Sequence, residues 1–158
     1  LDKLIVGKSG TFVINPAYHI HTDFDRFEGN CRQLERTSDP DMRCALYHKA
    51  VELYKGHLLP RIEHEIWHMQ LDMYYQTLYL TITKGYARYK LERKNYTDAL
   101  REIKNAMQLA PGDSELSMLA VLAAWYQGGR VLARRYYEAV KKYLDGDQII
   151  QIRTQLGF

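Results

Sequence analysis

The sequence predicts an all-α fold of stacked antiparallel helix pairs, preceded by a short β-hairpin. Three observations lead to this prediction. Apolar residues recur at three- and four-residue steps from Thr22 onward, which is the spacing of one helix face. Gly, Pro, Asn and Asp interrupt this spacing where helices begin or end. Part of the pattern returns after 34 positions, which indicates a repeated helix pair.

The composition is that of one soluble globular domain, or of one domain with a fragment of another. The chain has 158 residues, of which 46% are hydrophobic and 26% charged. A net charge of +3 from interleaved acids and bases does not by itself indicate nucleic-acid binding. Because we find no signal peptide and no apolar run of about 20 residues, we expect a cytoplasmic protein without a membrane anchor. The first residue is Leu1 and not methionine, so we also expect a fragment of a longer polypeptide.

The two cysteines predict no metal centre. Cys31 and Cys44 lie outside any C-x-x-C motif, and no spaced set of Cys and His suggests a closed zinc site. We interpret them as two buried thiols of a reducing compartment.

The N-terminal segment reads as two strands joined by a glycine-rich turn. The apolar runs Leu4–Val6 and Thr11–Ile14 flank Gly7–Gly10. Because an isolated two-stranded hairpin is marginally stable in water, it must pack on the helices or on a preceding domain.

Helix limits follow from capping residues and breakers. Asp39 before Pro40 predicts a helix start, and Gly56 predicts a helix end. Gly85 lies inside a long helical pattern, and either a close approach of a neighbouring helix or a local break would explain it. We expect Leu58–Leu59–Pro60 to be a connection with buried leucines. Helices are expected at 23–36, 40–55, 63–93, 96–110, 114–127 and 130–144, with a last short helix within 147–156.

The repeat matches one particular helix-pair unit. Its residues Tyr96, Ala99, Ile103, Ala106 and Pro111 follow the second half of a 34-residue tetratricopeptide (TPR) unit. Small residues let the two helices of a pair approach closely, and larger ones fill the space between pairs. The pattern therefore predicts a TPR-like right-handed stack, with an unrelated helical bundle as the alternative.

The order of motifs resembles a known family, the bacterial transcriptional activator domain of SARP-type and related transcription regulators. The resemblance covers about residues 20–145. It is carried by D-x-x-x-F (Asp23–Phe27), A-L-x-x-x-A-x-x-L-Y-x-G (Ala45–Gly56), L-L-P (Leu58–Pro60), Trp67, Y-x-x-A-L (Tyr96–Leu100) and G-R-x-x-A-x-x-x-Y (Gly129–Tyr137).

This resemblance implies a domain layout. Residues 1–20 would be the last hairpin, or wing, of a winged-helix DNA-binding domain, and residues 21–158 the TPR-like domain. Lys3 and Lys8 of the wing would touch only DNA phosphate, because base readout needs the recognition helix of the preceding domain. We therefore expect DNA contact only through that upstream domain, and no sequence-specific DNA binding by this chain alone.

The expected binding surface is the concave face formed by the first helix of each pair. Its apolar part can also be interpreted as core, above all at Leu122 and Trp125. The predicted partner-binding groove consists of Thr81, Lys84, Arg88, Met118, Leu122, Trp125 and Tyr126. A basic stretch at Arg130, Arg134, Arg135, Lys141 and Lys142 is interpreted as a solvated helix face, with contact to phosphate or to an acidic partner as the alternative.

One motif points to catalysis. His64–His68 spells H-E-x-x-H, which on a helix can bind zinc through its two histidines. No third ligand follows at metzincin spacing, and Glu92, which could serve as the third ligand of a gluzincin, lies just before a TPR turn. A zinc peptidase is therefore the third-ranked hypothesis. No phosphate-binding loop is found, because Gly7–Gly10 is too short for the P-loop spacing.

We therefore expect a non-enzymatic effector domain, without cofactor, that binds a protein partner or a second copy of itself and controls an attached DNA-binding domain. The alternative is a free-standing TPR adaptor, whose hairpin would belong to the same unit.

Overall fold

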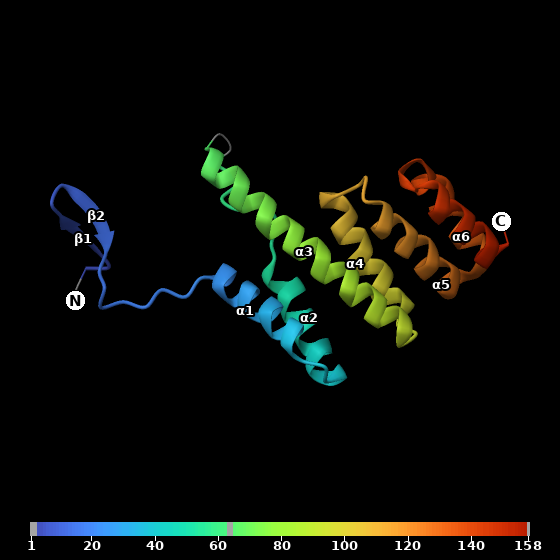
Figure 1. Cartoon of the computed structure of the whole chain (residues 1–158), viewed down its shortest axis with the longest axis horizontal. Coiled ribbons are helices and arrows are strands. Elements are labelled where there is room, and N and C mark those ends of the chain that lie inside the picture. Colours follow the sequence, from blue (N-terminus) through green and yellow to red (C-terminus); the bar gives the residue numbers. More distant parts are fainter. Residues whose placement is uncertain (1–2, 63–64, 158) are drawn as a thin grey trace.

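The computed structural model describes residues 3–62 and 65–157, and their elements follow the predicted order (Figure 1). A β-hairpin precedes a series of helices. The elements are β1 (Ile5–Lys8), β2 (Thr11–Ile14), α1 (Asp23–Arg36), α2 (Pro40–Leu53), α3 (Ile66–Glu92), α4 (Tyr96–Leu109), α5 (Ser114–Val140), a short 3₁₀ helix (Lys141–Tyr143) and α6 (Gly146–Leu156).

Side-chain caps fix the starts of five helices. Each cap oxygen accepts a hydrogen bond from a backbone N–H of the first turn, which would otherwise lack a partner. The capping residues are Thr22, Asp39, Asn95, Asp113 and Asp145. The acceptor–donor distances lie between 2.8 and 3.3 Å. Local chemistry in the sequence therefore sets these boundaries.

The helices pack as antiparallel pairs, as the repeat predicted. α1 packs against α2, and α3 against α4. α5 is interrupted where Gly128 and Gly129 leave helical geometry, Gly129 with a φ of 67°. The interruption divides α5 into the two helices expected at 114–127 and 130–144, although the second ends at Val140.

Two apolar clusters hold the stack together. The first joins α1, α2, α3, α4 and the start of α5. The second joins both halves of α5 to α6, and it contains Val121, Ala133 and Ile152. The alanines Ala87, Ala99 and Ala106 have no exposed surface, so helices approach closely at the small side chains that the repeat pointed to.

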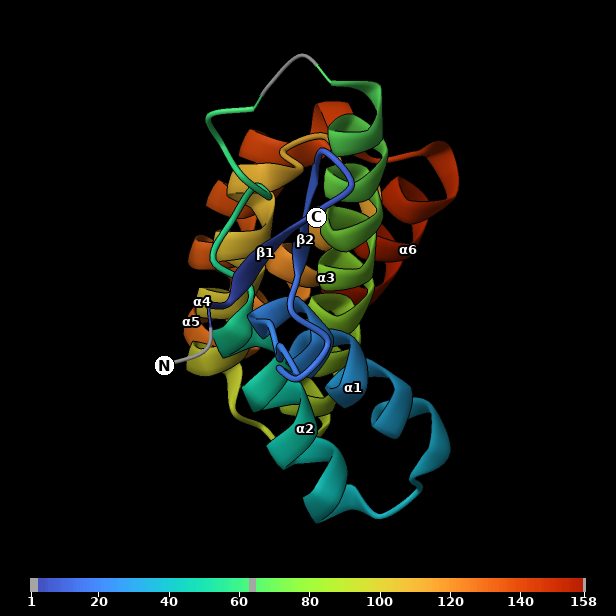
Figure 2. The ribbon, with the colours of Figure 1, turned by 90° about the vertical axis from the view of Figure 1, so that its left-hand side faces the viewer.

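The hairpin stands apart from the helices, at the end of an extended linker (Figures 1 and 2). Its strands pair antiparallel, from Ile5 opposite Ile14 to Lys8 opposite Thr11. β2 is exposed along its whole length, and Phe12 exposes 85% of its surface. The hairpin therefore does not pack on the described helices, which were one of the two packing partners expected for it.

The connection between α2 and α3 differs from the prediction in two respects. α2 ends at Leu53, and Gly56 lies beyond it with a φ of 118°. Leu58 is buried, but Leu59 exposes 48% of its surface, so the expectation of two buried leucines was wrong for Leu59. The reason is a left-handed turn at Leu59, with a φ of 43°, which points successive side chains in different directions. Among the described residues no helix combines the length and the apolar character that a membrane crossing needs.

Candidate interaction surface

The first turns of α3 extend beyond both neighbouring helices. The side chain of Gln76 donates to the carbonyl of Leu109, the last residue of α4, at 3.3 Å. Phe24, at the start of α1, packs on Tyr75 with ring centroids 4.6 Å apart. Residues Ile66–Tyr74, called here the α3 overhang, therefore project about 13 Å past these contacts at 1.5 Å per residue (Figure 1).

The overhang is apolar and exposed. In the span Ile66–Thr83 the one Asp, Glu, Lys or Arg is Asp72. Scattered exposed apolar residues are ordinary on protein surfaces, but contiguous ones mark contact sites. Those on the overhang are Ile66 (73% exposed), Trp67 (52%), Met69 (55%), Leu71 (39%), Met73 (65%) and Tyr74 (50%).

Asp72 fastens the connection between α2 and α3 to one side of the overhang. Its carboxylate accepts the backbone N–H of Leu58 at 2.6 Å and lies 2.8 Å from Nδ1 of His57. Partial burial raises the pKa of Asp72, but the hydrogen bonds from His57 and Leu58 outweigh burial, and the net pKa lies below its usual value. The charge of Asp72 is therefore used within the chain, and the exposed side of the overhang carries none.

His68, one helical turn before Asp72, completes this clamp. It is 5% exposed, and its Nε2 hydrogen-bonds the carbonyl oxygen of Leu58. A pocket of about 380 Å³ opens beside it, lined by His57, Pro60, His68, Met69, Asp72, Met73 and Gln76. The clamp and the overhang thus form one continuous surface with a hollow at its edge.

The helical zinc motif is not formed as the peptidase hypothesis required. Helix α3 begins at Ile66, so Glu65 is its N-cap residue and precedes the first turn. His64 lies outside the described residues. His68 points to the Leu58 carbonyl, and no group of three His, Cys, Asp or Glu suited to a metal occurs in residues 3–62 and 65–157.

The polar part of the predicted groove lies in an ion-pair seam between α3 and α5. Lys84 Nζ lies 2.6 Å from Asp113 and 3.3 Å from Glu115, and Arg88 pairs with Glu115. Lys84 and Arg88 therefore join α3 to the start of α5. The hydroxyl of Thr81, by contrast, donates to the carbonyl of Thr77 within α3.

The apolar part of the predicted groove lies elsewhere. Met118, Leu122 and Trp125 are partly buried and pack against the second apolar cluster, as in the core interpretation. Tyr126 is 57% exposed and stacks on Tyr96 with centroids 5.1 Å apart. The seven residues of the predicted groove therefore do not form one surface. They lie on the α3 side of the ion-pair seam, in the second cluster and in an exposed tyrosine stack.

The hairpin lysines are described only in part. Lys3 is exposed, and its carbonyl accepts the side-chain amide of Asn15 at 3.2 Å. The side chain of Lys8 lies outside the described part of the structure. Contact of either lysine with phosphate stays a prediction.

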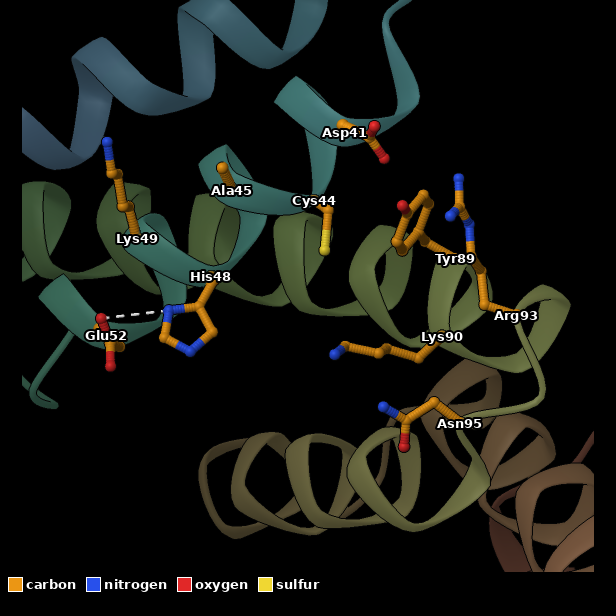
Figure 3. A pocket seen from close by; sticks show the side chains of 10 residues that line it. All are labelled: Asp41, Cys44, Ala45, His48, Lys49, Glu52, Tyr89, Lys90, Arg93 and Asn95. Carbon is orange, nitrogen blue, oxygen red and sulfur yellow. Dashed lines mark ion pairs between the residues drawn. The ribbon is translucent and has the colours of Figure 1, made fainter.

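A broad hollow on the helices lies between α2 and the junction of α3 with α4 (Figure 3). Its volume is about 740 Å³, and it is lined by residues of mixed charge. Two of its cations are engaged: Lys90 lies 3.5 Å from Asp98, and the Arg93 guanidinium stacks over the Tyr89 ring. Figure 3 shows these side chains around the opening, which is broad rather than enclosed.

Three residues of types found in catalytic sites line the same hollow, and the sequence analysis did not single them out. Cys44, His48 and Glu52 are spaced four apart on α2, and this spacing is the signal that could have revealed them. His48 pairs with Glu52 at 3.2 Å, but no hydrogen bond joins Cys44 to His48 within the described residues. The thiol instead lies against the Tyr89 hydroxyl, which donates to the Pro40 carbonyl at 3.1 Å. Cys44 therefore lacks the adjacent base that activates a nucleophile.

Comparison with known proteins agrees with the motif order. Residues 22–149 match the family model described as "Bacterial transcriptional activator domain". No curated protein matches the chain.

Proposed function

The chain belongs to the bacterial transcriptional activator domain family, a regulatory family, and from this premise we propose that it holds an attached DNA-binding unit of a transcription regulator through the α3 overhang. The single observation that carries the proposal is the row of exposed apolar side chains on Ile66–Tyr74. Exposed apolar surface is unfavourable in water. Full burial of one large apolar side chain by a partner contributes about 1.5–3 kcal/mol to the free energy of binding.

The position of the linker supports an attached unit as the partner of the overhang. Residues 15–22 join the hairpin to α1, whose Phe24 packs on Tyr75 at the base of the overhang. Any unit that contains the hairpin is therefore tethered beside this surface, and a short tether gives a millimolar effective concentration. The hairpin itself exposes Ile5, Phe12 and Ile14, so it needs further packing from a folded unit.

The mechanism follows from this geometry. The overhang is a continuation of α3, and α3 runs through the first apolar cluster. A unit bound to the overhang is held in a fixed orientation relative to the helix stack. A partner that competes for the overhang releases that unit, because one apolar surface cannot cover both.

A transcription assay with the full regulator tests the proposal. Trp67→Lys and Met73→Lys place a charge on the overhang at exposed positions, so the helices fold as before. Ile150→Lys is the matched control, since Ile150 is 64% exposed on α6. We expect each overhang variant to lower activated transcription at least tenfold, equivalent to about 1.4 kcal/mol, while the control keeps it. Wild-type activation by both overhang variants would rule the proposal out.

A further inference from the structure

A second hollow lies at the opposite end of the helix series, between the latter half of α5 and α6. It encloses about 440 Å³. Its lining comes from both helices and is dominated by arginine: Arg130, Arg134, Tyr137, Glu138 and Arg153. It shares no residue with the α3 overhang.

Backbone features bring the three arginines together. The break at Gly129 restarts the helix at Arg130, and Arg134 follows one turn later on the same face. Ile152 and Leu156 are buried in the second cluster, which fixes α6 and with it Arg153.

The Arg130 head group is held in place by the cap of α6. Gly157 ends α6 in the left-handed conformation, with a φ of 65°. Arg130 donates to the Gly157 carbonyl at 2.8 Å, so its guanidinium is already oriented before any ligand arrives.

The hollow carries more positive than negative charge. The side chains of Arg134 and Arg153 make no ion pair and no hydrogen bond within the described part of the chain. The acid in the lining, Glu138, pairs with Lys141 at 2.6 Å, and Lys141 and Arg134 both hold its pKa below the usual value. Three arginines therefore share one carboxylate, which Lys141 already neutralises.

We propose that this hollow binds a phosphate monoester. Guanidinium groups match phosphate oxygens with paired hydrogen bonds, and they remain charged at every physiological pH. A monoester carries close to two negative charges at neutral pH, which suits three arginines beside one acid.

An adjoining hollow accommodates the group that carries the phosphate. It encloses about 580 Å³ and shares Arg130, Arg134 and Glu138 with the first. Val131, which is 78% exposed and offers an apolar contact, lines it together with Arg135. A nucleic-acid strand fits less well, because each of its phosphodiesters carries only one negative charge and the next along the strand would meet the apolar Val131.

The test compares two probes that differ in one methyl group and one charge. Methyl phosphate represents the monoester, and dimethyl phosphate represents the diester of a nucleic-acid backbone. We expect saturable binding of methyl phosphate by NMR titration of the whole chain, at least tenfold tighter than that of dimethyl phosphate. Arg134→Gln and Arg153→Gln should each weaken methyl phosphate at least tenfold. Arg26→Gln, at an exposed position of α1, should leave it unchanged.

Three results would overturn the proposal: no saturable methyl phosphate binding, equal affinity for the two esters, or unchanged affinity in both pocket variants. Adenosine monophosphate and a phosphoserine peptide form a second arm. The tighter of these two identifies whether a small molecule or a modified protein supplies the ester. If neither binds more tightly than methyl phosphate, the assignment of the Val131 hollow is wrong.

Discussion

Tyr47 packs its ring directly against the backbone of Gly85, and this contact sets how closely α2 approaches α3. A Cβ atom built on Gly85 would lie 2.8 Å from the Tyr47 hydroxyl oxygen and 3.2 Å from a ring carbon. Tyr47 is 7% exposed, and its ring stacks on Tyr86 with centroids 5.5 Å apart. Its hydroxyl accepts a hydrogen bond from Arg43 at 2.9 Å. The absence of a side chain at Gly85 therefore leaves room for the Tyr47 ring. The explanation that holds is the close approach of a neighbouring helix.

Gly85→Ala should destabilise the protein, although alanine is the better helix former. We expect the free energy of unfolding to fall by about 1–3 kcal/mol, because the Tyr47 ring is fixed by its neighbours and cannot move aside freely. Gly29→Ala in α1 is the matched control, since a Cβ there would meet nothing within 4 Å. That control should gain up to about 1 kcal/mol in urea unfolding. Equal stabilisation by both substitutions would contradict the packing argument.

Asp72→Asn should weaken the clamp on the α2–α3 connection in a pH-dependent way. The folded pKa of Asp72 lies below the unfolded value of about 3.9, so its contribution is complete above that value. The contribution is lost as the pH falls through the lower folded pKa. We expect a cost of about 1–3 kcal/mol at pH 7 that shrinks towards zero in acid.

Urea unfolding of wild type and the Asp72→Asn variant between pH 2.5 and pH 7 measures this difference. Glu35→Gln is the control, because Glu35 is exposed on α1. A cost that stays constant down to the lowest pH would show that the Asp72 charge does not hold the clamp.

The two cysteines should differ sharply in reactivity. Burial raises the pKa of Cys31 to about 12, with Glu28 and Glu35 adding to the shift, so its thiolate is scarce at neutral pH. Cys44 is half-buried at the edge of the hollow in Figure 3. In native protein at pH 8, iodoacetamide should label Cys44 first and Cys31 only after unfolding, as peptide mass spectrometry would reveal. Labelling of Cys31 at the rate of Cys44 would refute the burial argument.

The fold was predictable because its signals are local. Capping residues such as Asp39 and Asn95, and the break at Gly128–Gly129, fix helix limits through their own backbone chemistry. Small residues such as Ala99 indicated the positions where helices come close, because only a short side chain fits there. These signals need no knowledge of distant parts of the chain.

The candidate surface was harder to predict because it depends on where neighbouring helices stop. The periodic pattern of Trp67 and Tyr74 is that of any buried helix face, and only the ends of α1 and α4 leave these residues uncovered. Conversely, Leu122 and Trp125 were assigned to a groove from the repeat, whereas α6 packs over their cluster. Exposure of an apolar residue is a tertiary property that periodicity alone cannot supply.

Fluorescence quenching of Trp67 tests the central claim most directly. The chain has two tryptophans, and Trp125→Phe leaves Trp67, 52% exposed near the start of the overhang, as the single reporter. We expect acrylamide to quench Trp67 readily in this chain. In a polypeptide that carries the proposed DNA-binding unit before the hairpin, we expect at least threefold weaker quenching. Equal quenching in the two proteins would contradict the docking of that unit on the overhang.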